Sequence, residues 1–287
     1  MLFTGLCTAL VTPFRAGAVD YGALRRLIAR QLEAGVPALL VCGTTGEAST
    51  LTEAEWCGVL SCAVETATGR ARVIAGTGTN NLPHTLARAR AARRLRADGQ
   101  LVVTPYYNKT TQRGLTAYYA RVAEETDLPM LLYNVPARTG LNLLPETAAA
   151  ICAHPHIVGV KEAAGDLGQL ARLLRLCPAP VYCGSDELAA PALRLGARGL
   201  ISVASNVAPE ALQSLCAHAL RGCFATAEAR QEALSPLISA LFAETSPAPA
   251  KAALALLGLC REEVRSPLIC VEDATRRRLQ ASLEALA

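Results

Sequence analysis

Lysine is scarce in this chain. Only three of its 28 basic residues are lysine, at positions 109, 161 and 251, and all the others are arginine. Lys161 stands out because it follows "IVGV" (157–160), which reads as a buried strand, where an unpaired ammonium is costly. We expect Lys109, in a polar loop, and Lys251, in a helical stretch, to be surface residues.

Charge and long apolar runs are also limited. The formal net charge is only +4, which gives no indication of a nucleic-acid partner. The basic stretch 88–99 has alanine and leucine between its arginines at helical spacing, so we interpret it as a solvated helix face. No apolar run approaches the roughly 18 residues of a membrane helix, and "MLFTGLCTALVTPF" has no basic leading region of a signal peptide. We therefore expect no membrane partner.

Cysteine and histidine are present, but not at the spacings typical of C-x-x-C motifs, metal sites or catalytic triads. None of the eleven cysteines forms a C-x-x-C pair, and several lie inside apolar runs (Cys7, Cys42, Cys152 and Cys183). Free cysteine in such runs behaves as a small hydrophobic residue, which favours a reducing, cytoplasmic location. None of the four histidines lies at the end of an apolar run, so neither a histidine-based triad nor a metal site is expected.

Eight short apolar runs provide the main structural signal. Each ends in glycine, threonine, proline, asparagine or a charged residue, and the gaps between them can hold a helix and two loops. Near-continuous apolar strands that alternate with helices are typical of a parallel sheet covered on both faces. Between them, 21–35 has helical spacing, and Thr52 with Glu55 forms a capping-box pattern. The runs begin at Thr8, Ala38, Arg72, Gln100, Pro129, Ile157, Pro180 and Gly199.

These units predict an α/β fold, a (β/α)8 TIM barrel with a small helical C-terminal extension. We place the catalytic barrel at 1–224 and the extension at 225–287, with breaks at Pro236, at 246–250 and at Pro267. An open doubly wound sheet is the alternative, although eight evenly spaced units favour closure.

Active sites of such barrels lie where the strands end. Lys161 ends the sixth predicted strand, and desolvation there would favour its neutral, nucleophilic amine. Its natural chemistry is imine formation with a ketone or aldehyde, and a phenol such as Tyr133 could shuttle the protons. Thr44, Thr45 and Arg138 follow neighbouring strands. The alternatives are a lysine stem packed under a solvated head, a structural tyrosine, capping threonines and an arginine paired at the surface.

Three motifs resemble the dihydrodipicolinate synthase (4-hydroxy-tetrahydrodipicolinate synthase) family of pyruvate-dependent class I lyases. They are "GTTGE" at 43–47, "YNVPARTG" at 133–140 and "GVKEA" at 159–163, and further matching segments follow the same order along the whole chain. The resemblance implies that Lys161 forms an imine with pyruvate, which then condenses with L-aspartate 4-semialdehyde on the route to diaminopimelate and lysine. It implies no organic cofactor and no metal.

The resemblance also implies roles for other residues. Tyr133 would relay protons with Thr44 and with Tyr107, which usually reaches in from a neighbouring subunit of a homotetramer built as a dimer of dimers. Thr45 would hold the pyruvate carboxylate, and Arg138 the carboxylate of the semialdehyde. Two further positions line the same pocket, Gly184 and Ile201.

Lysine-inhibited members of the family bind their end product at seven positions. The position of His84 often carries a glutamate that receives the inhibitor's amino group, and a histidine cannot supply that charge. We therefore expect weak or absent lysine feedback. The corresponding residues are Ala48, Ser49, Glu53, Trp56, Asn80, His84 and Tyr106.

The residues, taken without the family resemblance, are also compatible with two other functions. One is a Schiff-base aldolase such as N-acetylneuraminate lyase or a 2-keto-3-deoxy acid aldolase, although the sialic acid lyases usually lack the arginine at 138. The other is a non-catalytic barrel that binds a keto acid, against which the joint presence of Lys161, Tyr133 and Arg138 argues.

Overall fold

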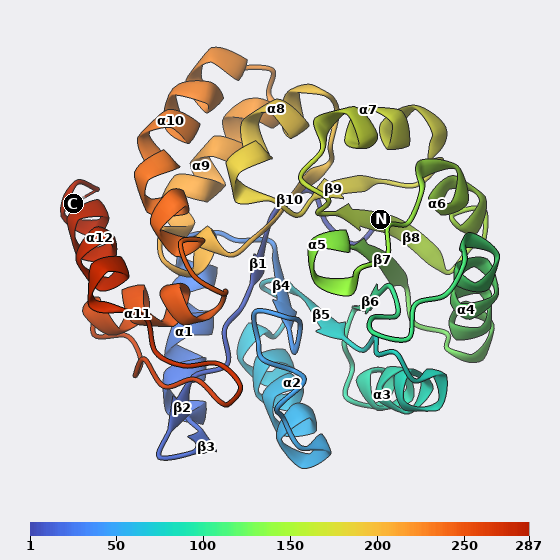
Figure 1. The fold of residues 1–287 in the computed structure, drawn as a ribbon, viewed down its shortest axis with the longest axis horizontal. Helices are drawn as coiled ribbons and strands as arrows, with labels where there is room; N and C mark the ends of the chain where they lie inside the picture. The colour runs from blue at the N-terminus through green and yellow to red at the C-terminus, as the bar shows by residue number, and fades with distance from the viewer. Residues whose placement is uncertain (287) are drawn as a thin grey trace.

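Parallel strands close into a barrel in the computed structural model, which describes residues 1–286 (Figure 1). In the described chain eight strands take part, in the order β1-β10-β9-β8-β7-β6-β5-β4. Each of the eight apolar runs overlaps one of them, although β1 shares only Thr8 and Ala9 with the first run. The predicted barrel is therefore confirmed, and the open sheet was the wrong alternative. The strands are β1 (Gly5–Ala9), β4 (Ala38–Val41), β5 (Arg72–Gly76), β6 (Gly99–Val103), β7 (Met130–Asn134), β8 (Ile157–Glu162), β9 (Val181–Cys183) and β10 (Gly199–Ser202).

Helices surround the barrel and follow its strands in turn (Figure 1). A hairpin of β2 (Phe14–Arg15) and β3 (Ala18–Val19), which the sequence did not predict, projects after β1. Short 3-10 turns η1 (Asp186–Leu188) and η2 (Ala204–Asn206) follow β9 and β10. The barrel helices are α1 (Tyr21–Glu33), α2 (Glu53–Ala67), α3 (Leu82–Arg94), α4 (Gln112–Glu125), α5 (Pro136–Thr139), α6 (Pro145–Ile151), α7 (Leu167–Leu176), α8 (Ala189–Arg194) and α9 (Pro209–Leu220).

The C-terminal extension consists of α10 (Phe224–Leu241), α11 (Ala248–Leu256) and α12 (Asp273–Glu284). It lies against α8, α9 and the η2 turn, and it occupies one side of the molecule (Figure 1). The division at residues 224 and 225 stays a prediction. Within residues 1–286, no helix has both the length and the apolar character needed to cross a membrane.

The barrel strands are apolar throughout because they are buried on both sides. Inward-facing side chains such as Leu40, Ile74, Leu101 and Leu131 fill the barrel, while a second cluster packs between the strands and the helices. Burial on both faces explains why these strands read as continuous apolar runs rather than alternating ones. The four cysteines expected inside apolar runs (Cys7, Cys42, Cys152 and Cys183) are buried free thiols, as predicted, although Cys152 lies at the end of α6 rather than in a strand.

Local sequence signals explain the helix ends. The predicted capping box begins α2: the Thr52 hydroxyl accepts from the Glu55 amide at 3.2 Å, and the Glu55 carboxylate accepts from the Thr52 amide at 2.9 Å. The predicted helix at 21–35 ends at Glu33, and Gly35 adopts the left-handed φ of +73° that favours glycine after a helix.

Three expectations were wrong. Pro236 does not break the extension, because it lies inside α10 on an exposed face where water can satisfy the carbonyl that proline leaves free. Arg88 is not part of a solvated face: it is buried and pairs with Glu53. Lys251 is not a surface residue, since its side chain is fully buried against Glu47, whereas Lys109 is exposed as expected.

Glu55 should make the stability of the fold sensitive to acid. Hydrogen bonds from the Arg265 guanidinium lower the pKa of Glu55 to about 2. A carboxyl group with a lowered pKa in the folded state stabilises the fold above its ordinary pKa, and this stabilisation is lost as pH falls toward 2. Glu55→Gln keeps the capping pattern and removes the charge. At neutral pH we expect it to cost about 1 kcal/mol, or about 2 °C in Tm.

The measurement is thermal denaturation of both proteins from pH 7 to pH 2. The difference in Tm should close as pH falls from about 4.5 to 2. Glu65→Gln on the same helix, where the carboxylate accepts only from Ser61 in the described chain, serves as the control. A difference that is constant over this range would contradict the assignment.

Candidate active site

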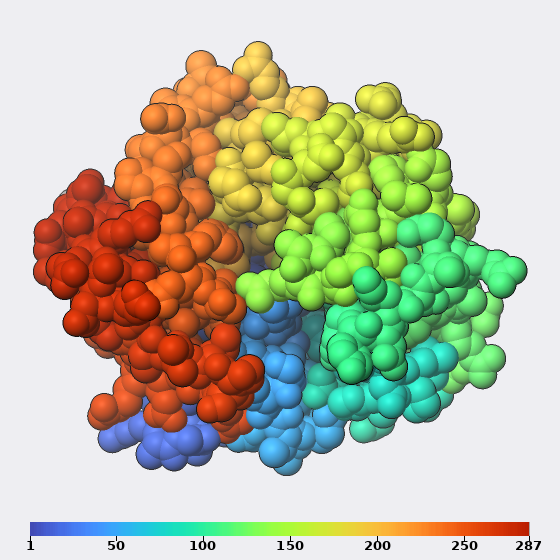
Figure 2. All heavy atoms as spheres, in the orientation of Figure 1, coloured from blue at the N-terminus to red at the C-terminus, as the bar shows by residue number. Residues whose placement is uncertain are grey.

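A cavity of about 660 Å3 opens at the carboxyl ends of the barrel strands. The surface is hollowed near its centre, where the blue segment after β4, the green segment after β7 and the orange extension meet (Figure 2). Six of the predicted site residues line this cavity, and α10 contributes its outer wall. The six are Thr44, Thr45, Tyr133, Arg138, Lys161 and Gly184.

Lys161 and Tyr133 form the floor of the cavity. They lie directly opposite each other on β8 and β7, because the register of these parallel strands pairs Tyr133 with Lys161. Lys161 Nζ lies 4.2 Å from the centroid of the Tyr133 ring, and the two residues are only 5% and 6% exposed. An amine and a phenol are therefore held together with little access to water.

Gly184 leaves the space that the lysine side chain occupies. A Cβ atom at this position would lie 2.8 Å from Lys161 Cε and 2.7 Å from Ala163 Cβ, closer than real Cβ contacts. The Gly184 amide also donates to the Glu162 carbonyl at 2.7 Å, which joins the end of β9 to that of β8. A residue without a side chain is thus required beside the amine.

Thr44 and Thr45 lie in a tight turn after β4. The Glu47 amide donates to the Thr44 carbonyl at 3.1 Å, and Gly46 packs so closely that a Cβ there would approach Cys42 N to 3.1 Å. Thr44 is exposed and Thr45 is buried. The turn therefore presents one hydroxyl at the mouth of the cavity and one within its wall.

Arg138 lies on α5, directly after β7, and reaches across the rim of the cavity. Its Nη2 donates to the Ser246 carbonyl at 3.3 Å, so the C-terminal extension helps to hold the guanidinium in place. Its remaining donors can serve a carboxylate, which a planar guanidinium binds bidentately.

Sequence reasoning missed the residues that align β7 with β8. Asn134 follows Tyr133, Glu162 follows Lys161, and the Asn134 amide donates to both Glu162 oxygens at 3.1 and 3.0 Å. Burial raises the pKa of Glu162 despite these hydrogen bonds. Since adjacent strand residues point to opposite faces, this polar pair lies outside the barrel behind the amine and the phenol. The dipeptides "YN" at 133–134 and "KE" at 161–162, in which a polar residue directly follows each site residue, were the signal that could have revealed this pair.

A buried carboxylate shapes the loop after β10. Asp186 accepts hydrogen bonds from the Ser202 hydroxyl and from the Val203 and Ala204 amides, and burial raises its pKa.

Ile201, a predicted pocket residue, is 1% exposed and packs in the inner core with Tyr133, beneath the cavity rather than in its lining.

Tyr107 is not brought to the site within this chain. Its side chain is 87% exposed, and its backbone is left-handed with φ of 64°, which is uncommon for a residue with a side chain. The neighbouring Tyr106 instead lines a second cavity of about 330 Å3.

This second cavity adjoins the first, because Thr44, Tyr133 and Arg138 line both. Three residues of the predicted regulatory set, Ala48, Ser49 and Tyr106, line the second cavity, as does the buried Arg88. The two cavities thus connect the floor at Tyr133 with the regulatory positions.

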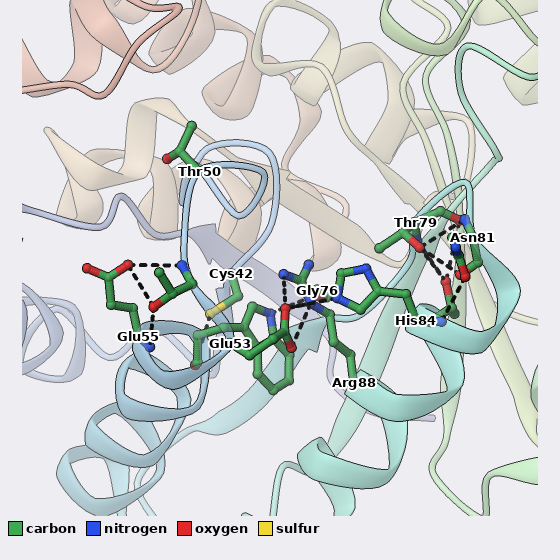
Figure 3. A network of polar contacts seen from close by, with 12 residues as sticks. Cys42, Thr50, Glu53, Glu55, Gly76, Thr79, Asn81, His84 and Arg88 are labelled. Carbon is green, nitrogen blue, oxygen red and sulfur yellow. Dashed lines mark hydrogen bonds and ion pairs between the residues drawn. The ribbon is translucent and has the colours of Figure 1, made fainter.

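Two of the other regulatory positions, Glu53 and His84, form a charged cluster with Arg88 between α2 and α3 (Figure 3). Glu53 accepts from Arg88 at 2.7 Å and lies 2.9 Å from His84 Nε2, and these two partners lower the pKa of its carboxyl group against the effect of burial. Trp56 is fully buried with its indole donating to the Gly76 carbonyl, and Asn80 is exposed before α3. The carboxylate of this cluster is therefore already paired.

Within residues 1–286, no group of three or more histidine, cysteine, aspartate or glutamate side chains is arranged to hold a metal ion. The cavity instead brings together an amine, phenolic and aliphatic hydroxyls and a guanidinium. This set can form an imine with a carbonyl compound and bind carboxylates.

Comparison with known proteins agrees with this chemistry. The model of the dihydrodipicolinate synthetase family matches residues 2–286. A curated relative from Maridesulfovibrio salexigens, named 4-hydroxy-tetrahydrodipicolinate synthase, is 43% identical over 99% of both chains. The crystal structure of dihydrodipicolinate synthase from Thermotoga maritima is 44% identical, with a TM-score of 0.98 over 99% of this chain and 98% of that chain.

A further solved structure is described as the first monomeric dihydrodipicolinate synthase variant. It also shares 44% identity and a TM-score of 0.98, and it covers 99% of this chain and 97% of its own. Sequence and fold are therefore shared over essentially the whole length of these proteins. The chain belongs to the dihydrodipicolinate synthetase family.

Proposed function

We propose that this protein is a lyase that condenses pyruvate with L-aspartate 4-semialdehyde to give 4-hydroxy-tetrahydrodipicolinate, the reaction for which its curated relatives are named. The observation that carries the proposal is the buried Lys161 amine, 4.2 Å from the Tyr133 ring on the floor of a cavity that Arg138 borders. Its place in metabolism is lysine and diaminopimelate biosynthesis.

The first step is imine formation. Lys161 Nζ attacks the C2 carbonyl of pyruvate, the carbinolamine loses water, and an iminium remains on the lysine. Tyr133 passes the proton that the amine gives up to the carbonyl oxygen and supplies the second proton with which hydroxide leaves as water; its phenolate then takes back a proton from the pyruvate methyl group. A desolvated amine is the nucleophile that this step needs, and arginine cannot replace it because it does not deprotonate.

The second step forms the carbon–carbon bond. Loss of a proton from the pyruvate methyl group gives an enamine, whose carbon attacks the aldehyde carbon of the semialdehyde. The amine of the condensed substrate then attacks the imine carbon, closes the ring and releases Lys161. The imine itself accepts the electrons, so the proposed reaction uses no cofactor.

Carboxylate recognition is divided between two elements. Thr45, in the turn after β4, holds the pyruvate carboxylate through its amide and hydroxyl, while the exposed Thr44 passes protons between Tyr133 and the solvent side. Arg138 binds the carboxylate of the semialdehyde. Gly184 keeps the neighbourhood of the lysine open, and Ile201 supports the floor from below.

We further propose a cytoplasmic homotetramer in which Tyr107 completes the relay of a neighbouring subunit. The support is its position: an 87% exposed tyrosine with a left-handed backbone is placed to contact another molecule rather than its own cavity. Closed symmetric assemblies are the usual form of soluble oligomers.

One observation favours an aldolase that acts on a sugar-derived acid as the second candidate. The wall of the cavity that α10 provides carries Gln231, Ser235 and Ser239, spaced four residues apart on one helix face. Such a row of polar side chains can bind a hydroxylated chain, and the same imine chemistry would serve it.

Lys161→Ala tests the proposed function. Purified protein should turn over pyruvate and L-aspartate 4-semialdehyde in an assay coupled to the enzyme that reduces the product. It should also gain a pyruvate adduct when treated with borohydride. The variant should lose the adduct and nearly all turnover, because no other lysine among residues 1–286 lines the cavity.

Lys109→Ala, at an exposed position, is the matched control and should retain both signals. A trapped adduct without turnover of the semialdehyde would move the protein to the aldolases. Unmodified Lys161 in the native protein would reject both candidates.

Tyr133→Phe tests the proton relay. The ring and its packing against Lys161 remain, but the hydroxyl is lost, so kcat should fall by roughly 10²–10⁴-fold. The measurement is steady-state kinetics together with the rate of imine formation, which should slow in the same variant. Retention of the native rates would leave Tyr133 with a structural role only.

L-Lysine should inhibit weakly or not at all. The Glu53 carboxylate is already paired with Arg88 and His84, and His84 carries no negative charge for an incoming ammonium. The coupled assay with added L-lysine measures this directly. Inhibition at sub-millimolar concentrations would show that the cluster opens to admit the ligand.

A further inference from the structure

A second buried lysine has no part in the proposed mechanism. Lys251 of α11 donates to a Glu47 oxygen at 2.5 Å, and both side chains are shielded from solvent, with exposures of 0% and 1%. Glu47 ends the "GTTGE" motif and therefore belongs to the turn that carries Thr44 and Thr45. The ion pair joins the C-terminal extension to this turn.

The lysine head is held on several sides. Its Nζ also donates to the Glu263 carbonyl at 2.7 Å and lies 4.0 Å from the centroid of the Phe14 ring. Burial lowers the pKa of Lys251, and the Glu47 carboxylate opposes this effect. These contacts allow the ammonium a single position beneath the turn.

The extension holds the turn at a second point. The other Glu47 oxygen accepts from the Arg265 amide at 3.0 Å, and the Arg265 guanidinium donates to the Thr50 carbonyl at 2.9 Å. The same guanidinium lies 4.3 Å from the centroid of the Phe14 ring. Two segments of the extension, at Lys251 and at Arg265, thus contact the turn at Glu47 and at Thr50.

The turn needs such support because its backbone is strained. Cys42 and Glu47 have left-handed φ values of 54° and 52°, although neither is glycine. Residues in this region persist only where their surroundings hold them. Glu47 is therefore anchored at the residue where the turn would otherwise relax.

A buried ion pair is a poor means of gaining stability, because apolar residues of similar volume often do as well or better. Its contribution is the orientation that it imposes on both partners. We propose that Lys251 and Glu47 are positioning residues through which the C-terminal extension sets the turn after β4, and with it the affinity of the site for the pyruvate carboxylate. This inference rests on the proposed function, since it assigns that carboxylate to Thr45.

The test compares Lys251→Met, Glu47→Gln and the double variant with the native protein. The fraction of protein trapped by borohydride is followed by mass spectrometry as pyruvate is titrated. Both single variants should raise the half-saturating pyruvate concentration by about tenfold to a hundredfold, as expected when a binding group is displaced. The double variant should have a half-saturating concentration no higher than that of either single variant, because the same ion pair between Lys251 and Glu47 is lost in all three proteins.

Arg276→Met is the matched control. It removes an ion pair with Glu262 inside the extension, a contact that involves neither Lys251 nor a residue of the turn, and should leave the half-saturating concentration unchanged. A lower yield of folded protein would reduce the amount of adduct without moving its half-saturation point, so the titration separates positioning from stability.

Amide hydrogen exchange of residues 43–50 gives an independent readout without pyruvate. Exchange there should become faster in Lys251→Met and in Glu47→Gln but not in Arg276→Met. Unchanged exchange and unchanged half-saturation in either folded variant would overturn the inference, as would failure of both variants to fold, which would make the pair a determinant of folding. A native protein that traps no pyruvate would instead reject the proposed function.

Discussion

The register between β7 and β8 is the constraint on which the site depends. It sets Lys161 opposite Tyr133 inside the barrel and, one residue later, Glu162 opposite Asn134 outside it. A shift by one residue would turn the amine toward the helices and the carboxylate into the cavity. The hydrogen bonds between Asn134 and Glu162 hold the strands against such a shift, so a polar pair outside the barrel fixes the geometry of the amine and the phenol inside it.

The two buried lysines use burial in opposite ways. Lys161 lies beside an aromatic ring at the floor of an open cavity, where a small molecule can reach its amine. Lys251 is enclosed with a carboxylate, which fixes its position. In a chain whose other basic residues are arginines, two of the three lysines lie where a small basic head either faces an open cavity or fits a closed space.

The sequence predicted what local patterns determine. Strands buried on both faces appear as apolar runs, and the capping box of α2 needs only the two residues Thr52 and Glu55, which are three positions apart. It did not reveal that Lys251 and Arg88 are buried, because their partners Glu47 and Glu53 are distant in sequence and neutralise charges that read as solvated. The prediction of a break at Pro236 was also wrong, because a helix tolerates proline where the freed carbonyl faces water. Which face of the helix is exposed depends on tertiary packing, and no local sequence pattern shows it.

The contact between Glu47 and Lys251 spans 204 residues, and it has a consequence for the order in which the protein is made. At about 5–20 residues per second, a ribosome takes about 10–40 s to pass from one partner to the other. The barrel strands can pair during this interval, but the turn after β4 has neither of its supports from the extension. The first segment of the candidate site to be synthesised is thus among the last to reach its final form, and an incomplete chain exposes an unfinished site.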